Sequence, residues 1–237
     1  MQILIIDQCS GTKKASERSE PLSMEAIDAK SRTELLSEDG VESYRASKLY
    51  QGRQQKRISE ATQLLEQAGD NVDRVFISAG FGVVDENEEL PLYDVTFSDL
   101  DATQIDNRSK NLEIQADLHE LITDSDYDIV FFALGSDYYR SAGLDEILPD
   151  VPEDTYVVFF NREDFEEEYN NGLSIPARTA QAKSYGTIVV ALKGEYLRNF
   201  ASHREAGEDI KDPNDIQEFC EESVEAQTDL CDYSSSN

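Results

Sequence analysis

A cysteine and two lysines follow the first apolar run of the sequence, at a spacing that suits covalent chemistry. Cys9 comes three residues after the run 3–6, and Lys13 and Lys14 lie four and five residues further on. A nearby ammonium group lowers the pKa of a thiol, and the resulting thiolate is a nucleophile. We therefore predict Cys9 and Lys13 as catalytic residues. The alternative is that Cys9 is a small buried hydrophobic residue.

Tyr93 and Asp94 form a second candidate pair, in the short segment 91–97 that follows an acidic loop. An aromatic ring that stacks on a base, beside a carboxylate that binds the edge of the base, is a common way to hold a nucleobase. Tyr93 is then predicted to bind a ligand and Asp94 to act on it. The alternative is an ordinary turn with an aromatic residue in the core.

The histidines and cysteines give no support for a metal site. His119 and His203 lack the close spacing of paired zinc ligands, and Cys9, Cys220 and Cys231 form no C-x-x-C pair. Both histidines are predicted to be structural, with His119 on the core-facing side of a helix. We expect no metal, no cofactor and no disulfide framework.

The distribution of charge marks two segments of the chain. The sequence has 50 acidic residues in 237, yet residues 43–59 contain none, and random placement gives such a gap a chance of roughly 2% at a given position. A second acid-free segment, residues 169–194, carries Arg178, Lys183 and Lys193. We expect these segments to be buried, to pack on acidic neighbours or to contact an anion. The basic residues of the first segment are Arg45, Lys48, Arg53, Lys56 and Arg57.

The overall charge is more informative about the cellular environment of the protein than about its binding partners. With 21 basic and 50 acidic residues the formal net charge is −29. Acidic residues spread over every surface segment are typical of proteins from salt-saturated cytoplasm, where a screening length of roughly 3 Å removes long-range repulsion of phosphate. We therefore predict a halophilic protein. No stretch approaches the ~20 apolar residues of a membrane span, so we expect a cytoplasmic protein without a membrane partner.

Five apolar runs predict the strands of a buried sheet. They are continuous rather than alternating, which is typical of parallel strands covered on both faces. Helical patterns over about 45–68, ending at Gly69, and over 107–123 lie between them. The fold class that follows is α/β, with a mostly parallel sheet of about five strands and helices on both faces, in three layers. The five runs are residues 3–6, 75–78, 129–134, 156–160 and 187–192.

The domain organisation is predicted to be simple. Residues 1–206 form a single α/β domain, with residues 15–43 as a polar excursion or flap. Residues 207–237 are strongly acidic and are expected to form a C-terminal tail with at most one short helix.

The ends of the predicted strands are the expected place for a ligand, because open parallel sheets bind ligands beyond their carboxyl ends. Small and hydroxylated residues follow three of the strands, and their backbone N–H groups can approach an anion or a flat ring closely. Phe81 and Tyr138 offer rings for stacking, although Tyr138 is equally suited to cap the sheet. The candidate ligand-binding residues at these tips are Ser10, Lys14, Ser78, Gly80, Phe81, Gly82, Gly135 and Tyr138.

Several of these segments together resemble the YaaA-like family of bacterial and archaeal proteins. The resemblance covers about residues 1–140 and rests on four blocks in order, namely residues 9–14, residues 45–52, residues 77–83, and Pro91 with Tyr93, Asp94 and Thr96. This family is similar to peroxide-stress proteins reported to bind DNA. The spacing of Cys9 and Lys13 also resembles the core motif of archaeosine synthase, although Gln8 stands where those relatives commonly carry proline. The resemblance implies that Cys9 and Lys13 lie in a base or nucleotide pocket.

These observations lead to three hypotheses for function. In the first, the protein binds a nucleic acid or a nucleotide-like ligand at the strand tips, and in one form of it modifies or excises a base. Lys13, Arg45, Lys48 and Arg53 would then hold phosphate. In the second, the protein is a non-catalytic DNA-binding module for oxidative stress or defence. In the third, it is an enzyme for a small phosphorylated metabolite.

Overall fold

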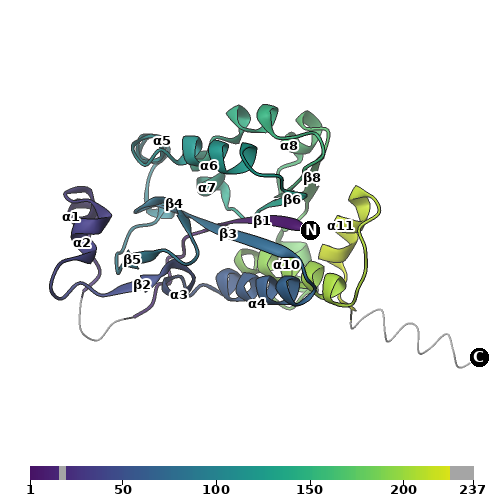
Figure 1. The fold of residues 1–237 in the computed structure, drawn as a ribbon, viewed down its shortest axis with the longest axis horizontal. Helices are drawn as coiled ribbons and strands as arrows, with labels where there is room; N and C mark the ends of the chain where they lie inside the picture. Colours follow the sequence, from purple (N-terminus) through teal and green to yellow (C-terminus); the bar gives the residue numbers. More distant parts are fainter. Residues whose placement is uncertain (16–19, 225–237) are drawn as a thin grey trace, which may run out of the picture.

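The computed structural model describes residues 1–15 and 20–224, and Cys231 lies outside them. Its centre is a six-stranded sheet in the order β4-β3-β1-β6-β7-β8 (Figure 1). All pairs in this sheet are parallel except β3 with β4. The predicted α/β class with a mostly parallel sheet is confirmed. The strands are β1 (Gln2–Gln8), β3 (Asn71–Ser78), β4 (Gly82–Asp85), β6 (Ile129–Phe132), β7 (Tyr156–Phe160) and β8 (Gly172–Ile175).

Helices cover both faces of the sheet because its strands are apolar on both sides. Ile3 and Ile5 of β1 pack into one core with α4 and α10, while Leu4 and Ile6 pack into the other with α5, α6 and α7. The two layers lie below and above the sheet in Figure 1. These helices are α4 (Arg53–Gln67), α5 (Ala102–Asn111), α6 (Ile114–Thr123), α7 (Ser136–Ala142) and α10 (Val189–Glu205).

A smaller part of the chain lies beyond the end of β1, at the left of Figure 1. Here β2 (Ser43–Arg45) pairs antiparallel with β5 (Glu89–Pro91). The predicted polar excursion, residues 15–43, contains two short helices in its described part, each with a serine N-cap. The helices of this part are α1 (Met24–Asp28), α2 (Arg32–Leu36) and α3 (Ala46–Leu49).

The prediction of a strand at residues 187–192 is wrong, because this segment begins α10. Its β-branched residues resemble a buried strand, but Ile188, Val189 and Val190 are exposed in the structure. The fifth parallel strand is β8 instead, which brings the central sheet to six strands with the antiparallel β4. The short sequence of β8 follows two asparagines, precedes Pro176 and carries a weak strand pattern.

Both predicted long helices are interrupted. The first helix starts only at Arg53, with Gly52 as its N-cap, and α3 precedes it as a separate turn. The second divides into α5 and α6, because Glu113 adopts a left-handed conformation with φ of 53°. Gly69 ends α4 as predicted, with φ of 88°.

Part of the predicted acidic tail belongs to the core. Helix α11 (Pro213–Glu221) packs against α10, and its Ile216, Phe219 and Cys220 are buried. The ring of His203 stacks on Phe219 at a centroid distance of 4.5 Å, so this histidine is structural as predicted. The α/β domain therefore extends through α11, past the predicted boundary at residue 207. The short helices α8 (Glu163–Glu168) and α9 (Thr179–Ser184) complete the described fold.

None of the helices in residues 1–15 and 20–224 is both long and apolar enough to cross a membrane.

The prediction that His119 faces the core is wrong. Its side chain is 41% exposed, and its Nε2 lies 2.9 Å from Asp150 Oδ2.

Candidate functional site at the strand tips

The chain reverses its direction across the sheet at the ends of β1 and β6. It passes from β1 to β3 on one side and then returns to place β6 on the other side of β1. In open α/β sheets, ligands bind at such a reversal, beyond the carboxyl ends of the strands. Gln8 joins the two strand ends here, because its Oε1 accepts a hydrogen bond from Gly135 N at 2.6 Å.

A groove with two compartments lies at these strand ends, and we call it the tip groove. The first compartment has a volume of about 470 Å³ and lies between residues 9–12 and the start of α4. The second has a volume of about 450 Å³ and lies between residues 134–139 and the start of α10. Both compartments are lined by Gln8, Ser98, Tyr138 and Val190, so they lie next to each other.

Three residues that line the first compartment have backbone N–H groups with no acceptor among the described residues. Helix α4 starts at Arg53 with no side-chain cap and no acid in its first turn. In the described part of the chain, the N–H groups of Ser10, Gly11 and Arg53 donate no hydrogen bond. A helix N-terminus next to loop N–H groups favours an anion. The Ser10 side chain lies close to the start of α4, with its Oγ 2.7 Å from the position that a Cβ on Gly52 would take.

The two acid-free segments of the sequence meet at the tip groove. Gly52 and Arg53 from the first segment line its first compartment together with Ile188 and Val190 from the second. The same two segments also line an adjoining pocket, through Arg53, Lys56 and residues 185–187. In the described part of the chain, no acidic residue lines the first compartment, whereas Glu60 and Glu195 also line the adjoining pocket.

Two basic side chains next to the first compartment, Arg53 and Lys56, are available to a ligand. Arg53 and Lys56 are exposed and form no ion pair with the described residues. Arg57 differs, because it pairs with Glu60 at 2.8 Å and with Glu195 at 2.7 Å. Arg53 and Lys56 are thus the cations that an incoming phosphate would meet.

A close contact between α4 and α10 fixes the position of one helix relative to the other. Gly194 of α10 lies against α4, and a Cβ at this position would be only 2.8 Å from both Arg57 Cβ and Gln54 O. Only glycine permits this approach without a shift of one helix. The starts of α4 and α10 are therefore held next to each other at the tip groove.

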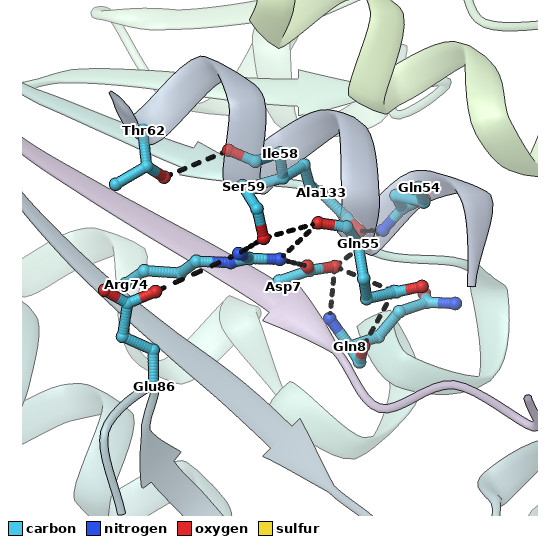
Figure 2. Close-up of polar contacts among 10 residues, drawn as sticks. All are labelled: Asp7, Gln8, Gln54, Gln55, Ile58, Ser59, Thr62, Arg74, Glu86 and Ala133. Atoms are coloured by element: carbon cyan, nitrogen blue, oxygen red, sulfur yellow. Dashed lines mark hydrogen bonds and ion pairs between the residues drawn. The ribbon is translucent and has the colours of Figure 1, made fainter. Parts of the chain in front are cut away.

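A buried polar network beneath the groove holds α4 against the sheet. Figure 2 shows Asp7 of β1 between Arg74 of β3 and two glutamines of α4. Arg74 Nη2 donates to Asp7 Oδ2 at 2.7 Å, and Gln54 Nε2 donates to Asp7 Oδ1 at 2.7 Å. Asp7 and Arg74 are 0% and 1% exposed. The first turn of α4 is therefore anchored by a desolvated ion pair.

Cys9 lies at the edge of the tip groove but is almost fully buried, with 1% of its surface exposed. Its Sγ lies 2.9 Å from the hydroxyl of Tyr138, which also lies 3.0 Å from Thr96 Oγ1. Burial raises the pKa of Tyr138 well above its usual value, so this phenol stays protonated. The burial of Cys9 agrees with the alternative interpretation, and its thiol lies within hydrogen-bond distance of Tyr138.

Lys13 does not form a hydrogen bond with Cys9. Its Nζ donates to Val95 O at 3.2 Å and lies 4.6 Å from the ring centroid of Tyr93. Burial lowers the pKa of Lys13, while the neighbouring Cys9 and Asp94 oppose this shift. Lys13 therefore stabilises the loops around Tyr93 in this structure.

Tyr93 is buried and is not open to stacking by a base. Its hydroxyl lies 2.7 Å from the Tyr50 hydroxyl and 2.8 Å from Ser78 Oγ, and Phe81 packs edge-on against its ring. Gly80 is required here, because a Cβ would lie 2.7 Å from the Tyr93 ring. Ser78, Gly80 and Tyr93 thus form part of the core beside the groove.

The remaining predicted residues lie outside the tip groove. Phe81 lines a separate pocket of about 430 Å³ near Arg108. Gly82 begins β4 with φ of 76°, and Lys14 Nζ lies over the Tyr44 ring at 4.1 Å. Arg45, Lys48 and Asp94 are exposed on the loops and short elements next to the groove.

The structure thus brings together only some of the predicted residues. Those in the tip groove are Cys9, Ser10, Arg53, Gly135 and Tyr138. Several other residues of the groove were not predicted from the sequence, and most of them come from the start of α10 and from the loop before α5. The acid-free segment 169–194 was the signal for the α10 residues. The missed residues are Gln8, Thr96, Ser98, Ile188, Val190 and Lys193.

Among residues 1–15 and 20–224, no group of three or more histidine, cysteine, aspartate or glutamate side chains is arranged to hold a metal ion. Comparison with known proteins finds no protein-family model and no curated protein that matches this chain.

Proposed function

We propose that this protein binds a phosphate-bearing nucleotide ligand in the tip groove, either a free nucleotide or one nucleotide of a nucleic acid strand. The phosphate lies in the first compartment, between residues 9–12 and the start of α4. The sugar and base extend into the second compartment, beside Gly135 and Tyr138. The resemblance of residues 1–140 to the YaaA-like family favours the same class of ligand.

One observation carries this proposal. In a chain of net charge −29, the two segments without acids converge on N–H groups and on two cations, Arg53 and Lys56, and none of these has an acceptor or an acidic partner among the described residues. The surface of such a protein is expected to carry acidic residues wherever it faces solvent. A surface segment without them is expected to contact an anion or another protein segment. A phosphate matches both the N–H donors and the basic side chains.

The volume of the tip groove favours the binding of a single nucleotide. Compartments of about 470 and 450 Å³ are typical of sites for small molecules. A small phosphorylated metabolite is therefore the second candidate. A nucleic acid strand also fits, because Arg53 lines both the groove and the adjoining pocket, where Lys56 is a second cation. Glu60 and Glu195 of that pocket are paired with Arg57.

The setting that we propose for this activity is a salt-rich cytoplasm. At molar salt, the general repulsion between an acidic protein and phosphate is screened over roughly 3 Å, while direct hydrogen bonds to N–H groups persist. Binding then depends on the local groove and little on net charge.

Binding of adenosine monophosphate and adenosine to the full chain tests this proposal. We expect the monophosphate to bind at least about 10-fold more tightly, because the phosphate supplies charge-assisted hydrogen bonds worth about 1.5–3 kcal/mol. Equilibrium dialysis in the same concentrated salt measures both affinities. Ribose 5-phosphate is the control for the second candidate, since equal binding of this compound would show that the base is not recognised. Equal affinity for adenosine and its monophosphate would refute the phosphate site.

A further inference from the structure

Helix α10 carries a buried lysine that reaches the end of β6. Lys193 is 8% exposed, and its Nζ donates to Leu134 O at 2.6 Å. It lines the second compartment of the tip groove, next to Gly135 and Tyr138. Within the described residues it forms no ion pair with a carboxylate. Lys193 is therefore a lysine that lines the groove without a direct counter-ion.

Burial limits the access of water to the Lys193 side chain. Ala177, Val189 and Val190 line the same compartment, and Val189 and Val190 are among the exposed aliphatic residues at its entrance. A ligand that fills the compartment would cover these side chains and exclude water further.

The electrostatics of this site favour the neutral amine. Burial lowers the pKa of Lys193 to about 8, while the charge of Asp7 opposes the shift. Asp137 and Arg162 are the other charged residues that line the compartment. At pH 8 about half of the Lys193 side chains would then be free amine, against roughly one part in 300 for an ordinary lysine.

A purely structural role explains the buried Lys193 less well. A carbonyl at a strand end is satisfied by water or by a neutral donor at lower cost than by an ammonium group without a direct counter-ion. Buried lysines with a lowered pKa serve as nucleophiles toward carbonyl groups. The reversal of strand order is also where this fold class binds its ligands.

We propose that Lys193 is a nucleophile of the tip groove, which forms an imine with the aldehyde or ketone carbonyl of a phosphate-bearing ligand. This proposal takes only the phosphate group of the ligand from the proposed function. The carbonyl group follows from Lys193 alone. The ligand class is a carbonyl compound with a phosphate ester, such as a sugar phosphate in its open-chain form.

The imine forms without any redox step. The neutral amine nitrogen attacks the carbonyl carbon, and a C–N bond forms as the C=O π bond opens. Both hydrogens of the amine leave with the carbonyl oxygen as one molecule of water, which gives the C=N bond. Lys193 must release its hydrogen bond to Leu134 O during this step.

Reductive trapping with pyridoxal 5′-phosphate tests the imine, because this probe carries an aldehyde, a flat ring and a phosphate. Cyanoborohydride converts the imine into a stable secondary amine that peptide mass spectrometry locates. At pH 8 we expect at least 10-fold more adduct at Lys193 than at Lys183, an exposed lysine in the same acid-free segment. The labelling rate at Lys193 should rise with pH through about pH 8.

Two matched variants complete the test. Lys193→Arg keeps the positive charge and should abolish the principal adduct, while Lys183→Arg should leave it unchanged. Equal labelling of Lys193 and Lys183 in the wild-type chain would overturn the proposal, and this comparison needs no variant to fold. Loss of the principal adduct in Lys183→Arg would overturn it as well.

Competition with adenosine monophosphate separates this inference from the proposed function. Protection of Lys193 by the nucleotide supports both. An adduct at Lys193 that the nucleotide does not prevent supports the imine and contradicts the nucleotide site. Nucleotide binding without an adduct at Lys193 refutes the imine alone.

Discussion

Replacement of Arg74 by methionine is expected to lower the free energy of unfolding by about 3–5 kcal/mol, because it leaves the carboxylate of Asp7 buried without its cation. Asp7 and Arg74 are 0% and 1% exposed, so water cannot take the place of the guanidinium group. The same substitution removes hydrogen bonds to Gln55 O at 3.1 Å and Ser59 Oγ at 2.8 Å, both on α4. Arg74→Met should therefore also loosen the start of α4 at the tip groove.

Urea denaturation at one fixed salt concentration measures this loss of stability. Arg140→Met is the matched control, because Arg140 and its partner Asp106 are 47% and 52% exposed and such pairs contribute at most about 1 kcal/mol. Replacing Asp7 by asparagine in the Arg74→Met background should recover part of the loss, since it removes the uncompensated charge. A loss in Arg74→Met no larger than that in Arg140→Met would contradict the role of the buried pair.

Reversal of two charges at the tip groove is expected to have the largest effect on binding. Arg53→Glu together with Lys56→Glu should weaken the binding of a 5′-phosphorylated single strand by about 30-fold or more, which is ~2 kcal/mol. The expected effect is local, because neither cation forms an ion pair with the described residues and Arg53 begins helix α4, which has no side-chain cap. Glutamate at these positions would also repel the phosphate directly. Fluorescence anisotropy of a labelled strand measures the change in affinity.

The control variant changes the net charge by the same amount, but at two lysines outside the tip groove. Lys110→Glu with Lys211→Glu alters two exposed lysines that lie outside the tip groove, at the end of α5 and before α11. We expect this variant to bind within about 2-fold of the wild-type chain at high salt, where long-range charge is screened. Equal weakening by both variants would mean that net charge, and not the groove, determines binding.

The central sheet was largely predictable because four of its parallel strands are buried on both faces. Such strands read as continuous apolar runs, and β1, β3, β6 and β7 all follow this rule. The segment 187–192 has the same composition but begins α10, where three of its aliphatic residues are exposed. Composition alone cannot distinguish apolar residues that fill a core from those at the entrance of a groove.

The candidate site was predictable only where its residues follow a strand directly. Cys9, Ser10, Gly135 and Tyr138 follow β1 and β6, whose carboxyl ends must meet because the strands pair. Tyr93 could not be assigned correctly, because its burial depends on contacts with distant residues such as Tyr50. The side chains from α10 depend on the packing of two helices, which no local pattern encodes.

Charge patterning gave the most useful information on the site. The gaps in the acidic residues at 43–59 and 169–194 lie more than a hundred residues apart in the sequence, yet they meet at the tip groove. Their meeting could not be deduced from the sequence, because it depends on the glycine contact between α4 and α10. It is the tertiary fold that turns two separate segments into one surface.

Mapping of backbone amide resonances during titration with adenosine monophosphate shows where the phosphate binds. We expect the largest shifts at the N–H groups of Ser10, Gly11 and Arg53, and adenosine without phosphate should not reproduce them. Largest shifts near Phe81 and Arg108, in the separate pocket, would contradict the claim that the tip groove binds the phosphate.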